Sequence, residues 1–239
     1  MQPRFVGRLG LADAVTVTNA ALGFLAIVVA FEDPELAARL VLLAAIADGL
    51  DGVVARWRGG TPAGPYLDSL ADVSSFAIAP AVVVFAVVAA DWSISLSLAD
   101  PYAIAALLLP ALFVAAAVTR LGLYTAYDTN ASYTEGVQST LAATIVGAAV
   151  LSGMTEPWFL LAVTGAFCYL MVSPLRYPDL LARDALLMGV VHTLAVLFPR
   201  ALDGSFPFAL LLLGLAYLIF APWLYWRDGW VLLELKEKS

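Results

Sequence analysis

The sequence predicts an all-α, polytopic integral membrane protein with about eight transmembrane helices, and three observations predict it. Hydrophobic residues make up 62% of the 239 positions and charged residues only 13%, whereas a soluble domain is about half apolar and about a quarter charged. Apolar segments recur along the chain at lengths near the roughly 20 residues that cross a bilayer. The basic residues gather on alternate loops, which is typical of a membrane protein with a defined orientation. We therefore expect a helical bundle embedded among the lipids of the cell membrane.

Eight apolar segments are predicted to be the membrane spans, taken in chain order. The first follows a short interfacial segment that carries Arg4 and Arg8, and an acidic loop around Glu32 separates it from the second. The seventh is the weakest, because it is short and Pro199 closes it. The predicted spans are Ala14–Phe31, Leu36–Val54, Leu67–Ala90, Tyr102–Tyr124, Val137–Gly153, Trp158–Val172, Ala185–Phe198 and Pro207–Trp226.

The basic residues predict the orientation of these spans. If the N-terminus lies in the cytoplasm, only Arg39 and Arg200 fall on the opposite side of the membrane. This bias supports an even number of spans, with both termini inside the cell. The cytoplasmic basic residues would be Arg4, Arg8, Arg56, Arg58, Arg120, Arg176, Arg183, Arg227, Lys236 and Lys238.

Charge and organisation narrow the class of protein further. The net charge of −7 argues against nucleic-acid binding, which needs a basic face. The chain shows no internal repeat, no low-complexity linker and no second domain. Residues 1–239 are therefore predicted to form a single membrane domain.

Four aspartates at the ends of the second and third spans are the most informative residues. An aspartate near the centre of a membrane helix costs about 2.5–3.5 kcal/mol, so four near one end need compensation. Asp48 and Asp51 are three residues apart, and Asp68 and Asp72 are four apart, so each pair shares one helical face. The connection at residues 56–64 turns the chain, and we expect the two pairs to face one another.

Clustered carboxylates with only Arg56 nearby must take up protons or bind cations. Oxygen ligands suit Mg²⁺, Mn²⁺ or Ca²⁺, and the absence of His and Cys from the cluster argues against zinc. Gly49 and Gly52 weaken a helix but allow close approach of a ligand to the backbone. The glycine-rich connection that follows could meet a phosphate with its backbone N–H groups.

The aspartates belong to a longer motif with eight fixed positions in 25 residues. These positions are Asp48, Asp51, Gly52, Ala55, Arg56, Gly64, Asp68 and Asp72. The pattern resembles the CDP-alcohol phosphotransferase family, and no position of the motif departs from it.

The resemblance implies a role for each motif residue. Asp48, Asp51 and Asp68 would be metal ligands for one or two Mg²⁺ or Mn²⁺ ions, and Asp72 would be the catalytic base and a further ligand. The CDP portion of the substrate would contact Gly52, Arg56, Thr61 and Gly64. The segment that carries Thr16 and Asn19 resembles the part of the family's first helix that lines the nucleotide site, although these two side chains could instead satisfy neighbouring backbone groups.

Further segments are similar to the phosphatidylserine synthase branch of the family. They are the run from Leu67 to Ala81 and the Met-Val-Ser and Arg-Tyr residues between Leu170 and Pro178. The longer basic run that is usual at the end of the fourth helix is not kept around Arg120. An acceptor that carries a phosphate should require a dense basic pocket, yet the chain has no lysine before Lys236. Serine has only a carboxylate and an ammonium group, so it fits this composition better.

Arg120 and Arg176 are the predicted partners of the acceptor carboxylate. The ammonium group could meet Glu135 or a backbone carbonyl, and the sequence does not choose between them.

The predicted function is transfer of a phosphatidyl-type group from CDP-diacylglycerol or CDP-archaeol to L-serine, with release of CMP. The site should open on the cytoplasmic side of the membrane. A homodimer is carried over from the family. Residues 1–180 would be the family core, and residues 181–239 would add two C-terminal helices.

Three alternatives remain open at this point. One is the same chemistry with glycerol phosphate or inositol phosphate as acceptor. The others are a cation transporter that uses its intramembrane aspartates and a catalytically silent scaffold.

Overall fold

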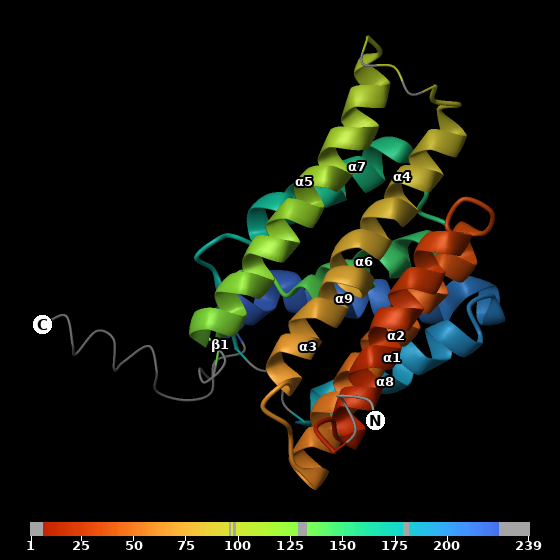
Figure 1. Cartoon of the computed structure of the whole chain (residues 1–239). Helices are drawn as coiled ribbons and strands as arrows, with labels where there is room; N and C mark the ends of the chain where they lie inside the picture. The colour runs from red at the N-terminus through yellow and green to blue at the C-terminus, as the bar shows by residue number, and fades with distance from the viewer. Residues whose placement is uncertain (1–6, 96, 98, 129–132, 179–181, 225–239) are drawn as a thin grey trace, which may run out of the picture.

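The structure, a computed structural model, is a bundle of helices and describes residues 7–95, 97, 99–128, 133–178 and 182–224 (Figure 1). It confirms the predicted all-α class, with a short two-stranded ribbon in addition. The helices are α1 (Leu11–Val29), α2 (Pro34–Arg58), α3 (Gly64–Asp72), α4 (Ala79–Asp91), α5 (Pro101–Leu123), α6 (Ser139–Leu151), α7 (Pro157–Leu170), α8 (Ala182–Leu197) and α9 (Ser205–Leu224).

Three helices begin with an acidic residue followed by proline. The side chains of Asp33, Asp100 and Glu156 accept hydrogen bonds from backbone N–H groups in the first turns of α2, α5 and α7, at 2.9, 2.9 and 2.8 Å. The proline that follows each cap has a fixed φ that suits the first helical position and lacks the N–H that would be unpaired there. These caps define one end of the bundle, from which α2 and α5 run toward the end that carries Asp51 and Arg120.

The third predicted span is one continuous rod made of α3, a π-helical segment η1 (Val73–Ile78) and α4. Figure 1 shows α3 and α4 along a common axis. The wider π turn begins directly after Asp72. Such turns rotate the side chains that follow relative to those before, and they occur often at functional sites.

Helix α1 approaches η1 closely because glycine occupies the contact. A Cβ atom at Gly23 would lie 2.8 Å from the backbone carbonyl carbon of Ser74. Ser74 and Ser75 donate hydrogen bonds from their hydroxyls to the carbonyl oxygens of Ala20 and Asn19, at 3.2 and 2.8 Å. This contact holds the polar face of α1 beside the end of α3.

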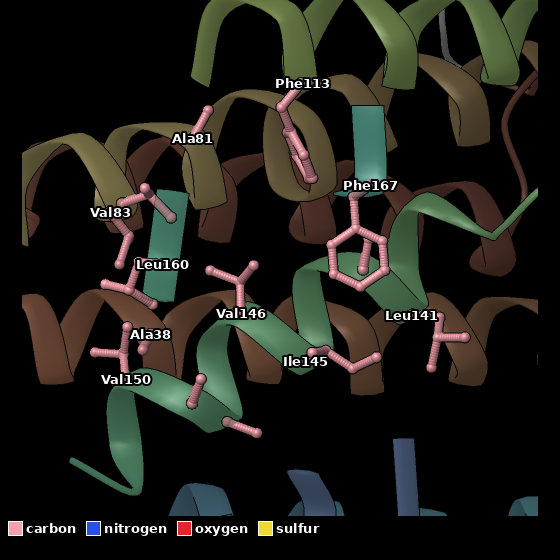
Figure 2. Close-up of a cluster of buried hydrophobic side chains, with 14 of the residues drawn as sticks. Ala38, Ala81, Val83, Phe113, Leu141, Ile145, Val146, Val150, Leu160 and Phe167 are labelled. Atoms are coloured by element: carbon pink, nitrogen blue, oxygen red, sulfur yellow. The ribbon is translucent and has the colours of Figure 1, made fainter. Parts of the chain in front are cut away.

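Helix α6 lies at the centre of the bundle and is buried along nearly its whole length. It packs against α2 on one side and α9 on another. Its Leu141, Ile145, Val146 and Val150 belong to one hydrophobic cluster with buried side chains of α2, α4, α5 and α7 (Figure 2). These side chains include Ala38, Ala81, Val83, Phe113, Leu160 and Phe167. A helix that is apolar all round belongs in such a position.

The ribbon joins two connections at the end of the bundle that carries the aspartates. Strand β1 (Tyr133–Glu135) pairs antiparallel with β2 (Arg176–Pro178), so that Glu135 lies opposite Arg176. Gly136 extends the pairing by donating its N–H to the Leu175 carbonyl at 2.7 Å. The sequence pattern did not predict these strands, since each is only three residues long.

Helix α9 is fastened to this ribbon by two tyrosines. The Tyr177 hydroxyl donates to the Leu218 carbonyl at 3.2 Å, and the Tyr217 hydroxyl donates to the Pro178 carbonyl at 2.7 Å. Burial raises the pKa of the Tyr177 phenol, so this group stays a protonated donor at neutral pH. The C-terminal helices therefore pack on the rest of the bundle.

Each predicted span falls on a helix, but the count of eight membrane crossings is not confirmed. Among the described residues, four helical stretches are long and apolar enough to cross a bilayer: Leu11–Val29, Gly64–Asp91, Pro101–Tyr127 and Ala201–Trp223. Helix α2 has 25 residues, but charged groups near both ends interrupt its apolar run. Helices α6, α7 and α8 are shorter; the 13 residues of α6 extend about 20 Å, against a hydrocarbon core of about 30 Å.

The basic side chains that the structure describes separate between the two ends of the bundle. At the capped end, Arg39 donates to the Val196 carbonyl at 2.9 Å, and Arg200 pairs with Glu35 at 2.8 Å. Other described arginines lie at the opposite end, on α2, α5 and β2. The remaining residues of the predicted charge bias lie outside the described residues, in full or by their side chains: Arg4, Arg183, Arg227, Lys236 and Lys238. The prediction that both termini are cytoplasmic stays a prediction.

Replacing Gly136 with alanine should destabilise the protein. Gly136 has φ +76°, and an added Cβ would lie 2.1 Å from the Met171 carbonyl oxygen. The expected loss is at least about 2 kcal/mol, seen as a lower midpoint of thermal unfolding in detergent. Gly189→Ala is the control, because nothing lies within 4 Å of the added Cβ atom. Alanine also stabilises an exposed helix relative to glycine. Equal unfolding midpoints for both variants would contradict this role of Gly136.

Candidate active site

Three of the four predicted carboxylates come together at one end of the bundle. Asp48 extends from α2, and Asp68 and Asp72 extend from α3, with ligand oxygens that all lie within 4.8 Å of one another. Asp72 is buried, and the other two are partly buried. The two helices therefore face one another as the spacing predicted. We call these three residues the carboxylate triad.

The fourth carboxylate, Asp51, lies beside the triad and has its own partner. It is buried, and its Oδ2 accepts a hydrogen bond of 2.5 Å from the Thr16 hydroxyl on α1. The structure thus places Thr16 against an acidic residue of the motif, in addition to a neighbouring backbone carbonyl at Ala12.

Asn19 contacts the triad from α1. It is fully buried, and its Nδ2 donates to Asp72 Oδ1 at 3.4 Å. Its Oδ1 has no hydrogen-bond partner among the residues that the structure describes. A buried polar atom without a partner costs roughly 1–3 kcal/mol. Asn19 therefore presents an unused oxygen next to the acidic cluster.

The donor set of this cluster fits a hard divalent cation. Three carboxylates in an apolar bundle repel one another unless positive charge lies between them. The sequence predicted that Arg56 alone lies near the cluster. This prediction is wrong, because Arg120 also interacts electrostatically with Asp72. A single guanidinium beside Asp72 does not balance three carboxylates. Oxygen ligands alone are what Mg²⁺, Mn²⁺ and Ca²⁺ take.

A large cavity of about 490 Å³ opens beside the triad, and Asp51 and Asp68 form part of its wall. Five of the six residues predicted to contact CDP line it: Thr16, Gly52, Arg56, Thr61 and Gly64. Asn19, the sixth, is not among the lining residues, because it is buried against Asp72. Helix α2, the glycine-rich connection and α3 thus line one cavity, so that a single ligand could contact all three parts of the motif.

Asp13 begins the first-helix segment that resembles the family, but the sequence assigned it no role of its own. It is buried at the edge of the large cavity and accepts hydrogen bonds from the Gly10 N–H at 2.7 Å and from the Thr61 hydroxyl at 2.9 Å. Asp13 thereby ties the α2–α3 connection to the start of α1. The sequence could have indicated this role, because Asp13 lies three residues before Thr16 and the two therefore share one face of a helix.

The connection after α5 closes the other side of the large cavity. Tyr124 and Thr125 begin a second π-helical segment, η2 (Tyr124–Asp128), and both line the cavity. The Thr125 hydroxyl is hydrogen-bonded to the Ser69 hydroxyl, which joins η2 to α3 next to Asp68.

A small cavity of about 380 Å³ lies on the far side of Arg120, lined by Arg120, Tyr127, Glu135, Ser173 and neighbouring residues. Arg120 is buried, donates to the Thr134 hydroxyl at 3.0 Å and lies over the Tyr124 ring at 5.1 Å. Since Tyr124 lines the large cavity, this contact joins a residue of one cavity to a residue of the other. Arg176 is not among the residues that line the small cavity; it pairs with Glu135 at 3.2 Å.

The profile of the CDP-alcohol phosphatidyltransferase family matches residues 9–199 of this sequence. The chain belongs to this family. The match includes the whole acidic motif and continues through α8, beyond the predicted end of the core at residue 180. The division into a core and a two-helix extension stays a prediction.

This CDP-alcohol phosphatidyltransferase is similar to several curated proteins. One is the archaetidylserine synthase of Methanothermobacter thermautotrophicus, 29% identical over 174 residues, which are 71% of this chain and 70% of that protein. Another is the CDP-diacylglycerol–serine O-phosphatidyltransferase of Mycobacterium leprae, 45% identical over 78 residues, or 32% of this chain and 26% of that protein. The enzyme of the same name from Mycobacterium bovis is 37% identical over 100 residues, or 41% and 35%. The match thus spans about a third or less of the mycobacterial enzymes.

Family membership and the fold together give three conclusions. The chain is a CDP-alcohol phosphotransferase by enzyme type. It is an integral membrane protein, because its long apolar helices need a bilayer. Its carboxylate triad offers the ligands for the divalent metal that this family generally uses.

Neutralising one carboxylate of the triad should have opposite effects on thermal stability without metal and with metal. Asp68→Asn should raise the unfolding midpoint in EDTA, because it relieves repulsion among the carboxylates. The same change should remove the rise that Mn²⁺ produces in the unaltered protein, where an excess of a hundred times Kd stabilises by about 2.7 kcal/mol. Thermal unfolding in detergent, with and without Mn²⁺, measures both effects.

Asp91→Asn is the matched control, because Asp91 is exposed at the capped end of the bundle and should keep the full response to Mn²⁺. An undiminished Mn²⁺ response in Asp68→Asn would show that the triad is not the metal site.

Proposed function

We propose that this enzyme transfers a phosphatidyl-type group from a CDP-linked lipid to the hydroxyl of L-serine and releases CMP. The product would be phosphatidylserine or, from a CDP-archaeol donor, archaetidylserine. The observation that carries the proposal is a pair of cavities, one lined by Asp51 and Asp68 and the other by Arg120, which interacts electrostatically with Asp72. The larger is lined by the family motif and suits the nucleotide end of the donor, and the smaller suits a compact acceptor.

The relatives support serine as the acceptor. The archaetidylserine synthase matches over 71% of this chain, and both mycobacterial enzymes are named for transfer to serine. The described lining of the small cavity includes one arginine and no lysine. A pocket that binds a phosphate group normally has several basic side chains that donate to it. This lining therefore favours an acceptor whose anionic group is a carboxylate and not a phosphate.

The residues of the chain can supply the steps of this transfer. Thr16, Arg56 and Thr61 would bind the CDP portion in the large cavity. Asp72, held by Asn19, would take the proton from the serine hydroxyl as its oxygen forms a bond to the phosphorus next to the lipid. The bond from that phosphorus to CMP breaks, and CMP leaves with the electron pair. Positioning and charge stabilisation can carry such a transfer without a covalent enzyme intermediate.

The metal would be Mg²⁺ or Mn²⁺, as one ion or two, held by the triad together with Asp51. When bound, it would neutralise the pyrophosphate and stabilise the leaving CMP. The site would open at the cytoplasmic side, because Arg56, Arg58 and other arginines gather at this end of the bundle. The homodimer expected from the family belongs to the proposal as well.

The acceptor is tested with purified protein, a CDP-lipid and Mn²⁺, with CMP release as the readout. We expect release with L-serine and little release with glycerol phosphate or inositol phosphate, and no release in EDTA. CDP-diacylglycerol and CDP-archaeol are compared in separate assays. Release with glycerol phosphate but not with serine would reject the serine assignment. Metal flux into vesicles without any CMP release would favour a cation transporter.

Asp72→Asn should remove turnover and leave binding of the CDP-lipid largely intact. An asparagine of nearly the same shape cannot accept the acceptor proton, and general-base catalysis contributes roughly 100- to 10,000-fold. We therefore expect kcat to fall about a thousandfold while the CDP-lipid still protects the protein against thermal unfolding. Asp91→Asn, with the same loss of charge away from the site, should keep normal kcat. A kcat within tenfold of the unaltered enzyme would exclude Asp72 as the base.

A further inference from the structure

Among the residues that the structure describes, the small cavity is lined by one charged group of each sign. Arg120 contributes a buried guanidinium from the end of α5, and Glu135 contributes a carboxylate from β1. The other described lining residues, which include Tyr127 and Ser173, are uncharged. A cavity with both signs is complementary to a small zwitterion, whereas a phosphate monoester, which is anionic only, would meet the Glu135 carboxylate with like charge.

The ribbon fixes the position of Glu135. Glu135 lies opposite Arg176 in the antiparallel pairing, and its Oε1 accepts from Arg176 Nε at 3.2 Å. Arg176 also lies over the Tyr133 ring at 4.8 Å. The next residue, Gly136, holds the chain by its bond to the Leu175 carbonyl. Glu135 is therefore set at the cavity wall by backbone pairing and by an ion pair outside the cavity lining.

Glu135 also retains capacity to bind a ligand. Its side chain is 47% exposed, so water-borne solutes can reach it. The ion pair uses Oε1, and Oε2 has no partner within the part of the chain that the structure describes. An ammonium group can bind this second oxygen without breaking the pair with Arg176.

Arg120 lines this cavity and also interacts with Asp72, the proposed base. Its electrostatic interaction with Asp72 and its contact with Tyr124 place it between the small cavity and the triad. If Arg120 bound the carboxylate and Glu135 the ammonium group, two of the three non-hydrogen substituents of the serine α-carbon would be held. The third substituent is the hydroxymethyl group, which would remain to face Asp72.

We infer that Glu135 binds the ammonium group of the acceptor in the small cavity, and that it selects an amino-acid acceptor over one that carries a phosphate. The inference rests on the proposed function and names the specificity residue within it. It also decides between the two partners that the sequence left open. A charged carboxylate binds an ammonium more strongly than a neutral carbonyl does, because a hydrogen bond between two charged groups is stronger than one to a neutral acceptor.

The test compares two acceptors that differ only in the amino group: L-serine and 3-hydroxypropionate. In the unaltered enzyme, we expect kcat/KM to be higher for serine. Glu135→Gln should lower kcat/KM for serine roughly 10- to 100-fold, mainly through KM, and should leave that for 3-hydroxypropionate within about twofold. The preference for the amine-bearing acceptor should therefore disappear in this variant.

Arg176→Gln is the matched control, because it breaks the same ion pair and keeps the Glu135 carboxylate. We expect it to retain the preference for serine over 3-hydroxypropionate, whatever its overall rate. Equal losses for both acceptors in Glu135→Gln, or the same loss of preference in both variants, would show that Glu135 only supports the ribbon and would overturn the inference.

The proposed function and the inference fail in different ways. If the unaltered enzyme uses glycerol phosphate and not serine, the proposed function fails, and the Glu135 role fails with it. If the unaltered enzyme uses serine and Glu135→Gln keeps the serine preference, only the inference fails. Thermal unfolding of each variant in detergent shows that the kinetic changes are measured on folded protein.

Discussion

The whole site depends on the repulsion among carboxylates that the fold brings together inside an apolar bundle. Asp48 on α2 and the pair on α3 have ligand oxygens within 4.8 Å of one another, in a chain that is 62% hydrophobic. Burial and mutual repulsion both oppose ionisation of such a cluster. A bound cation would remove that opposition, so the geometry that brings the carboxylates together also favours binding of a divalent ion. Arg120 offsets part of the charge next to Asp72.

The packing of α1 is what makes the cluster possible. Gly23 allows α1 to contact the backbone of η1, and the serine hydroxyls of η1 hold it there. One face of α1 then presents Thr16 and Asn19, which are bonded to Asp51 and Asp72 of the motif, and Asp13, which is bonded to Thr61 in the connection between the two motif helices. The first helix therefore organises the acidic motif, although the motif itself lies entirely on the next two helices.

In the proposed function, the donor and the acceptor would bind in separate cavities. The motif surrounds the large cavity, while the small one is formed by the end of α5, β1 and the connection after α7. Residues that are far apart in sequence, such as Arg120 and Ser173, meet only there. A change of acceptor could therefore evolve in the small cavity without disturbing the metal site or the nucleotide contacts.

The sequence by itself determined the helical membrane class, the acidic motif and the family. These properties depend on composition and on spacing within single helices, because residues three or four apart share a face in any helix. It also indicated Arg120, because a charged residue at the end of an apolar span needs a partner.

Only the tertiary structure separated Asp51 from the triad, placed Asn19 on Asp72 and brought Asp13 to Thr61. The same holds for the ribbon that sets Glu135 opposite Arg176. These contacts join segments separated by dozens of residues, and no local periodicity encodes which of them meet. They are decided by how closely the helices approach, which in turn depends on packing at positions such as Gly23 and Gly136.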